Sequence, residues 1–195
     1  SGDYAGALTK TLELIDYEEQ RKQQKVLRES GVYMGIGIAY ELTPEGGTLP
    51  GTLVAGYDTS TVKVDPSGFV TVLTGVTDPG GGNRTGIGQI VADVLGVEFE
   101  NVRIIQGDTQ ACPYGFGNYS GRSTIVGGGS AALAAEDIKA QIKILAAAMM
   151  EVSEDSVEIF RGMVTTTADP TAQLSFSEVC YAAYTRNYDI AACIE

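Results

Sequence analysis

Two glycine-rich stretches, each placed where a helix is expected to begin, constrain this chain more than any other feature of its sequence. The first runs from Gly75 to Gly88, with six glycines in fourteen residues, between a predicted strand and an amphipathic helix. Glycine lets the backbone approach a ligand closely, and a helix start presents free N–H groups with about half a positive charge. This combination is typical of an anion-binding loop, and a tight strand-to-helix turn is the alternative.

The second stretch, from Tyr114 to Thr124, leads into a predicted Ala-rich helix. Between Thr109 and Ala135 the sequence holds no Asp or Glu, although the chain has 25 acidic residues, and Arg122 is the only charged residue there. A guanidinium among glycines and hydroxyls at a helix start suits phosphate oxygens. A loop whose hydroxyls merely cap the helix is the alternative for this stretch alone. Together, the two loops predict one anionic ligand held where they converge.

The composition excludes several classes of protein. The net charge of −12 argues against binding to nucleic acid or to an anionic membrane surface, since both need clustered Lys and Arg. The chain has no histidine, and its three cysteines form no Cys-x-x-Cys pair, which excludes a protein-ligated zinc, a haem-ligating histidine and a histidine-assisted nucleophile. No apolar run reaches about 18 residues, so we expect no transmembrane helix. The widely spaced cysteines indicate reduced thiols and a cytoplasmic protein.

Hydrophobic periodicity predicts the secondary structure of the first half of the chain. Residues 5–29 are expected to be helical, and residues 32–75 are expected to form strands. Within that strand region, the turn at residues 65–68 predicts a hairpin, because alternating apolar positions flank it. Gly35 and Gly37 lie in an earlier strand-like stretch, where they indicate a bulge or close backbone packing.

The second half alternates predicted helices and strands. The expected elements are a helix over residues 87–95 closed by Gly96, a strand over 102–105, a helix over 123–150, a hairpin around Gly162, and a last helix that begins at a capping box of Ser175 and Glu178. This order of elements predicts an α+β fold with a mixed β-sheet and long packing helices.

The first loop is also similar to a dinucleotide fingerprint, through Gly80, Gly82 and Thr85. That fingerprint follows a buried parallel strand, whereas the strand before this loop is predicted to be antiparallel in a hairpin. The acidic residue after the next strand, Asp108, also comes later than the expected spacing of about 20 residues. A nicotinamide-dependent enzyme is kept as a further alternative. No Gly-Lys-Ser/Thr follows either loop, which excludes a P-loop.

The motifs, in their order and spacing, resemble the second molybdopterin-binding region of the molybdenum hydroxylases. That family includes xanthine dehydrogenases, aldehyde oxidoreductases and the large subunit of carbon monoxide dehydrogenase. The resemblance covers most of the chain and is carried by residues 74–85, 89–97, 107–109, 113–117 and 121–124, followed by the Ala-rich helix that ends at Glu151.

The resemblance implies a molybdopterin cofactor, in its cytosine dinucleotide form in a bacterial protein. By position in the family's motifs, the cofactor would lie between two walls, formed by Gly80, Gly81, Gly82, Arg84 and Thr85 and by Ser120, Gly121, Arg122, Ser123 and Thr124. The reaction implied is hydroxylation of an aldehyde, an aromatic heterocycle or a similar small carbon centre, with water as the oxygen source. Electrons would leave through iron–sulfur clusters and FAD on partner domains or subunits.

The sequence departs from the family's pattern in several places. Many members have glutamine where Gly81 stands, and Ser120-Gly121 replaces the commoner Gly-Ser order. The family's glutamate base belongs to a later motif that has no counterpart before Glu195. We therefore interpret residues 1–195 as part of a molybdopterin-binding domain that holds no catalytic residue and no metal ligand and is inactive alone.

Ser1 is not preceded by an initiator Met, so we expect the chain to be a piece of a longer protein. Its partners would then be the remaining domains of the large subunit. An isolated piece exposes apolar surface, which predicts self-association into a homo-oligomer. The alternative function is a non-catalytic anion-binding or scaffold domain that kept the fold but lost the cofactor.

Overall fold

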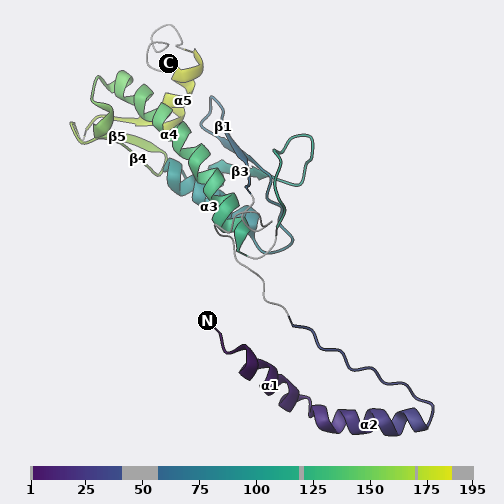
Figure 1. Cartoon of the computed structure of the whole chain (residues 1–195). Helices are drawn as coiled ribbons and strands as arrows, with labels where there is room; N and C mark the ends of the chain where they lie inside the picture. The colour runs from purple at the N-terminus through teal and green to yellow at the C-terminus, as the bar shows by residue number, and fades with distance from the viewer. Residues whose placement is uncertain (1, 41–56, 119–120, 170, 186–195) are drawn as a thin grey trace. The chain divides into compact units, whose positions relative to one another are not determined.

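The chain divides into two units, Ser1–Leu42 and Thr43–Glu195, and each is described by itself. The computed structural model describes residues 2–40, 57–118, 121–169 and 171–185. Figure 1 shows the elements in chain order, coloured from purple at the N-terminus to yellow at the C-terminus. Among the described residues, no helix is both long enough and apolar enough to cross a bilayer.

The first unit contains two helices, α1 (Tyr4–Leu14) and α2 (Tyr17–Glu29). The single helix predicted over residues 5–29 is interrupted at Asp16, whose φ of 49° lies in the left-handed region that a right-handed helix excludes. Neither helix buries a residue within the described structure. The charged stretch of α2 is therefore a solvated face.

The strands predicted immediately after α2 are absent from the described residues. Residues 32–40 have no regular secondary structure, and a Cβ added at Gly35 or Gly37 would meet nothing within 4 Å. The predicted strand and the predicted close packing are therefore wrong for this stretch. A strand needs a neighbouring strand to accept its backbone hydrogen bonds, and the described residues of this unit contain none. The part of the prediction that falls on residues 41–56 lies outside the described residues.

The second unit is built on a mixed sheet of three strands in the order β1-β2-β3. The predicted hairpin is confirmed: β1 (Ser60–Val64) pairs antiparallel with β2 (Val70–Thr74) across the turn at residues 65–68. On its other edge, β2 pairs in parallel with β3 (Val102–Ile105). The strand before the first glycine-rich loop is thus parallel to one neighbour, and the prediction that it is antiparallel was incomplete. A hairpin pattern predicts the neighbouring strand on one edge of a strand and gives no information about the neighbour on the other edge.

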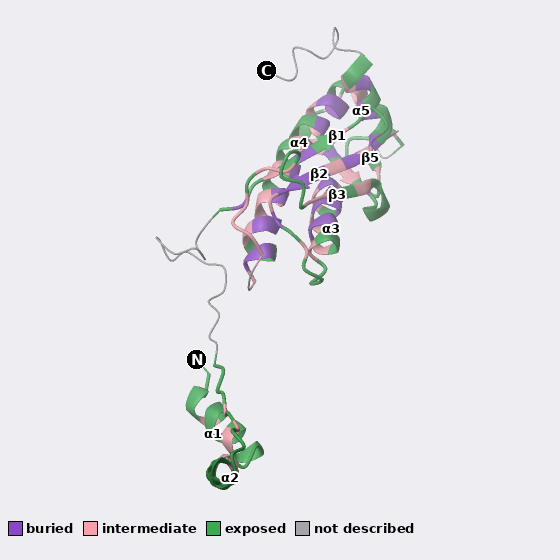
Figure 2. Ribbon diagram, turned by 90° about the vertical axis from the view of Figure 1, so that its right-hand side faces the viewer, coloured by how far each residue is buried: buried purple, intermediate pink, exposed green. Residues whose placement is uncertain are grey.

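Two helices pack on this sheet and contribute many of the buried residues of the core. The predicted helix after the first loop is α3 (Asn83–Leu95), which connects β2 to β3 and ends at Gly96 with a φ of 73°. The predicted long helix is α4 (Gly128–Met150), preceded by a π-helical turn, η3 (Ser123–Gly127). Helices α3 and α4 pack against each other, with α3 on β3 and α4 on β1. Figure 2 shows their buried faces turned toward the sheet.

A second, smaller sheet follows α4. It has the order β4-β5-β6 and is antiparallel throughout, as the hairpin predicted at Gly162 requires. The last helix begins at the predicted capping box: the N–H of Ser175 donates to Oε2 of Glu178 at 2.7 Å, and the N–H of Glu178 donates to Oγ of Ser175 at 3.1 Å. The α+β class with a mixed sheet is therefore confirmed. The elements of this part are β4 (Val157–Phe160), β5 (Met163–Thr166), β6 (Gln173–Ser175) and α5 (Phe176–Thr185), with short 3₁₀ turns η2 (Phe99–Asn101) before β3 and η4 (Glu154–Ser156) before β4.

Candidate functional site

The two glycine-rich loops meet beyond the ends of β2 and β3. The side-chain amide of Asn83, at the start of α3, donates a hydrogen bond of 2.9 Å to Oδ1 of Asn118 in the second loop. The hydroxyl of Ser123, at the start of η3, donates to the same oxygen. At their bases the loops are in close backbone contact, because a Cβ added at Gly75 would lie 2.7 Å from Cα of Gly115. The predicted convergence of the two loops is confirmed.

A carboxylate from the first loop itself accepts hydrogen bonds from the backbone amides of that loop. Oδ1 of Asp78 accepts from the N–H groups of Gly80 at 2.9 Å and Gly82 at 3.1 Å, and Oδ2 accepts from the N–H of Arg84 at 3.2 Å. Donation from the N–H groups of Arg84 and Gly80, with a smaller part from Gly82, lowers the pKa of Asp78 below its ordinary 3.8. Amides that were predicted to be free for an anion thus donate to Asp78.

The three consecutive glycines of this loop border open space. A Cβ added at Gly80, Gly81 or Gly82 would meet nothing within 4 Å. Gly80 and Gly82 have φ values of 109° and 81°, which only glycine adopts without strain. Gly81 has neither a positive φ nor a close neighbour among the described residues. No contact in the described part of the chain therefore requires glycine at position 81.

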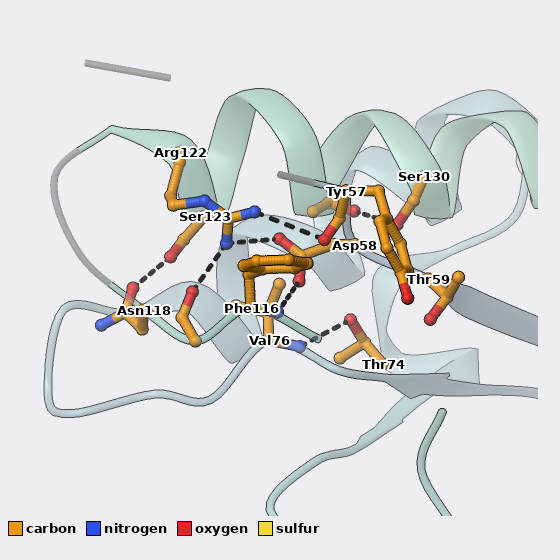
Figure 3. A network of polar contacts seen from close by, with 12 residues as sticks. Tyr57, Asp58, Thr59, Thr74, Val76, Phe116, Asn118, Arg122, Ser123 and Ser130 are labelled. Carbon is orange, nitrogen blue, oxygen red and sulfur yellow. Dashed lines mark hydrogen bonds and ion pairs between the residues drawn. The ribbon is translucent and has the colours of Figure 1, made fainter. Parts of the chain in front are cut away.

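The one charge of the second loop is completely buried. Nη1 of Arg122 lies 2.7 Å from Oδ2 of Asp58, and neither side chain has any exposed surface. The guanidinium also donates to the carbonyl of Gly117 at 2.7 Å and to the carbonyl of Tyr57 at 3.5 Å. Figure 3 shows it pointing from the helix start toward Asp58, beside the ring of Phe116. The residue predicted to contact phosphate is thus engaged inside the protein.

Sequence reasoning missed Asp58, which also organises the base of the second loop. Its Oδ1 accepts the N–H of Phe116 at 3.1 Å, and its backbone forms an isolated antiparallel bridge with Gly115. The rings of Tyr57, Tyr114 and Phe116 cluster next to it, with centroids 5.4 to 6.2 Å apart. A lone arginine in an uncharged stretch was the only sequence signal that a distant carboxylate was needed.

The remaining predicted residues differ in exposure. Ser123 is buried, Gly121 is partly buried, and Thr124 is exposed. Ser120 lies outside the described residues. Those that face outward in the described structure are Gly80, Gly81, Gly82, Arg84, Thr85 and Thr124.

A cavity of about 350 Å³ opens beside both loops, at the carboxyl ends of the parallel strands β2 and β3. Thr77 of the first loop and Tyr114 of the second line it, together with Asp108 and Cys112 from the segment after β3. Crevices at the carboxyl ends of parallel strands are a common place for ligands. Larger cavities of about 400 and 590 Å³ border α5 and include no described residue of either loop. None of the predicted site residues that the structure describes lines any of these three cavities. The cavity beside the loops is therefore the better candidate.

Comparison with known proteins identifies the family. The sequence profile of the molybdopterin cofactor-binding domain matches residues 10–193. The large subunit of nicotine 6-hydroxylase from Paenarthrobacter nicotinovorans is 29% identical over 188 residues, which cover 94% of this chain and 23% of that subunit. The carbon monoxide dehydrogenase large chain of Hydrogenophaga pseudoflava is 33% identical over 192 residues, which cover 94% of this chain and 24% of that chain.

Solved structures show the same relationship. Quinoline 2-oxidoreductase from Pseudomonas putida 86 superposes with a TM-score of 0.66 and 34% sequence identity, over 96% of this chain and 24% of that chain. The chain thus spans about a quarter of the length of these relatives.

Proposed function

Because the chain belongs to the molybdopterin cofactor-binding domain family, we propose that its two glycine-rich loops form part of the surface that holds the cofactor in a molybdenum hydroxylase. The observation that carries this proposal is the junction of the loops at Asn83, Asn118 and Ser123. Two segments far apart in the sequence meet there, next to a cavity at the ends of parallel strands.

The described residues fit a large ligand in two respects. The backbone at residues 80–82 is open on the side where a Cβ would project, so a ligand can approach it without displacing a side chain. Arg84 and Thr85 are exposed at the same helix start and can donate hydrogen bonds.

In this proposal the outward-facing residues contact the cofactor, and the buried ones hold the loops in place. Gly80, Gly81, Gly82, Arg84 and Thr85 would form one wall, and Ser120, Gly121 and Thr124 would contribute to the other. Arg122 and Ser123 position the second loop from inside, through Asp58 and Asn118. When bound, the cofactor supplies the two-electron oxidation that transfers oxygen from water to carbon.

The finer parts of the proposal concern the whole protein. We propose that residues 1–195 are part of the second molybdopterin-binding domain of a large subunit, that the cofactor is the cytosine dinucleotide form, and that the substrate is an aldehyde, an aromatic heterocycle or a similar small carbon centre. The remaining domains of the subunit, together with iron–sulfur and flavin partners, would complete the electron path. Self-association and a cytoplasmic location belong to the same proposal.

A second function has one observation in its favour. The amides of Gly80, Gly82 and Arg84 in the first loop donate to Asp78, and Arg122 of the second loop is paired with Asp58 within the protein. These groups therefore have hydrogen-bond or ion-pair partners without a ligand, as a non-catalytic scaffold domain would need. Molybdenum analysis of the complete subunit separates the two functions, because a scaffold would carry none.

The direct test substitutes Gly81, the glycine that no described contact requires. In the complete subunit, Gly81→Leu is expected to leave the melting temperature unchanged and to lower the molybdenum and pterin content per folded protein about tenfold, equivalent to roughly 1.4 kcal/mol of binding. Gly129→Leu is the matched control, since Gly129 also borders open space and leucine favours a helix. Full cofactor content in Gly81→Leu would contradict the role of the first loop. Release of one cytidine monophosphate per molybdenum on hydrolysis would support the dinucleotide form.

A further inference from the structure

A chain of hydroxyl groups joins the start of the first loop to the helical turn that follows the second. Oγ1 of Thr74, the last residue of β2, accepts the N–H of Val76 at 3.2 Å (Figure 3). The hydroxyl of Ser60 in β1 donates to the same oxygen at 3.2 Å and lies 2.9 Å from the hydroxyl of Ser130 in α4. The Ser130 hydroxyl also donates to the carbonyl of Gly127, the last residue of η3, at 2.8 Å. Side chains from β1, β2 and α4 therefore connect the two segments.

The two segments also touch each other directly at this point. Thr74 and Val76 have no exposed surface, and a Cβ added at Gly127 would overlap the side chain of Val76. The N–H of Val76 is thus shielded from water, and Oγ1 of Thr74 is its acceptor. Because a buried N–H that loses its acceptor costs free energy, the hydroxyl chain opposes movement of the first loop away from η3.

This connection is separate from the junction at Asn83, Asn118 and Ser123, with which it shares no residue. None of its three hydroxyl residues belongs to either wall of the proposed cofactor site. Any effect of these hydroxyls on the cofactor would therefore pass through the backbone of the loops. Residues that orient the groups in contact with a ligand typically change its affinity about 10–100-fold when they are substituted.

We propose that Thr74, Ser60 and Ser130 are positioning residues, which hold the start of the first loop and η3 in a fixed relation so that both loops face the cofactor together. The inference rests on the proposed function for its consequence, which is the retention of the cofactor. The coupling between the two segments does not depend on the cofactor and can be measured on the 195-residue chain.

The second sheet supplies a matched control with the same pattern of hydrogen bonds. Oγ1 of Thr166 accepts the N–H of Ala168 at 3.2 Å and lies 2.8 Å from the hydroxyl of Ser156, which donates to the carbonyl of Ser153 at 2.6 Å. Thr166 is buried, and none of these residues belongs to either loop. Thr74→Val and Thr166→Val therefore each remove a hydroxyl that accepts the N–H two residues later, while the side chain keeps its size.

Hydrogen exchange of the 195-residue chain tests the coupling. Thr74→Val is expected to accelerate exchange about tenfold at the amides of the first loop and of residues 125–130, because both ends of the hydroxyl chain are released. Thr166→Val is expected to leave the exchange of these amides unchanged. Ser60→Ala removes the link but leaves Val76 its acceptor, so it is expected to give a smaller change at both ends. It also provides the test if Thr74→Val does not fold.

Retention of the cofactor is followed in the complete subunit. During dialysis, molybdenum and pterin are expected to be lost about tenfold faster from Thr74→Val than from the wild type, and at the wild-type rate from Thr166→Val. The two variants lose the same kind of hydrogen bond, so a general loss of stability would affect both. Thr74→Ser keeps the hydroxyl and is expected to restore both hydrogen exchange and cofactor retention.

Three results would overturn the proposal. The first is accelerated exchange confined to the N–H of Val76, which would show that Thr74 acts only on its own neighbour. The second is equal exchange or equal cofactor loss in Thr74→Val and Thr166→Val. The third is coupled exchange with cofactor retention that stays at the wild-type level. A wild-type subunit without molybdenum would instead contradict the proposed function, and the exchange experiment would still measure the coupling.

Discussion

The two glycine-rich loops each contain several glycines and one arginine, but their polar groups are satisfied in different ways. The first loop is exposed, and its helix-start amides are satisfied by Asp78, a residue of the loop itself. The second loop is anchored in the interior, where Arg122 pairs with Asp58 from a distant part of the chain. A local carboxylate leaves the backbone of a loop open to the outside, whereas a distant one ties the loop to the core.

This difference shows what a glycine-rich helix start does and does not indicate. Glycine, hydroxyls and an arginine at a helix start describe a set of donors, and the origin of the acceptor decides whether those donors serve a ligand or the fold. In the first loop the glycines at residues 80–82 border open space, whereas Gly115 in the second loop and Gly127, which follows it in η3, are packed against other segments. The backbone of the first loop is therefore accessible from outside at residues 80–82, and in our proposal this loop faces the cofactor while the second loop is anchored to the core.

The largest expected effect comes from breaking the buried pair. Asp58→Leu leaves the charge of Arg122 without its carboxylate in the interior, and the expected loss in free energy of unfolding is about 3–5 kcal/mol. The double substitution Asp58→Leu/Arg122→Met removes both charges and is expected to lose much less. Urea unfolding followed by circular dichroism measures both variants. Equal losses in the single and double variants would show that the ion pair does not anchor the second loop.

A pair of glycine substitutions gives effects of intermediate size and opposite sign. A Cβ at Gly127 would overlap the side chain of the buried Val76, so Gly127→Ala is expected to destabilise the protein by about 1–3 kcal/mol. Gly86, in α3, borders open space, and Gly86→Ala is expected to stabilise it by about 0.5–1 kcal/mol. Thermal unfolding of the two variants provides the measurement. Destabilisation by both would mean that the helix starts after the two loops do not differ in packing at these positions.

Much of the fold follows from local sequence patterns. The amphipathic spacing that predicts α3 and α4, the turns of both hairpins, and the capping box at Ser175 each depend on residues close together in the chain, and each is confirmed. The parallel pairing of β2 with β3 could not be predicted in the same way, because it joins strands separated by α3 and leaves no turn signal. The break at Asp16 also carries no strong local signal.

The candidate site also has one part that local sequence patterns could predict and one part that they could not. The Asp58–Arg122 pair links two distant segments, and no spacing rule connects them. Asp78, in contrast, was accessible to sequence reasoning. An aspartate two residues before a glycine, in a turn, is a common signal for a carboxylate that caps the following amides. The prediction was based on the glycines and did not include Asp78, whose carboxylate accepts the hydrogen bonds of the loop amides.

The smallest expected effect is on the pH dependence of stability, and it tests the local half of the comparison. Hydrogen bonds from the N–H groups of Arg84 and Gly80 lower the pKa of Asp78 in the folded protein below the 3.8 of an unperturbed carboxyl. A group with a lowered folded pKa contributes stability that is present above its unfolded value and is lost as the pH falls through the folded value. A carboxyl-carbon NMR titration should therefore find Asp78 titrating below 3.8, and Asp78→Asn should remove this contribution to acid unfolding. An unshifted titration would show that the first loop is not held by its own carboxylate, and the contrast with the second loop would then fail.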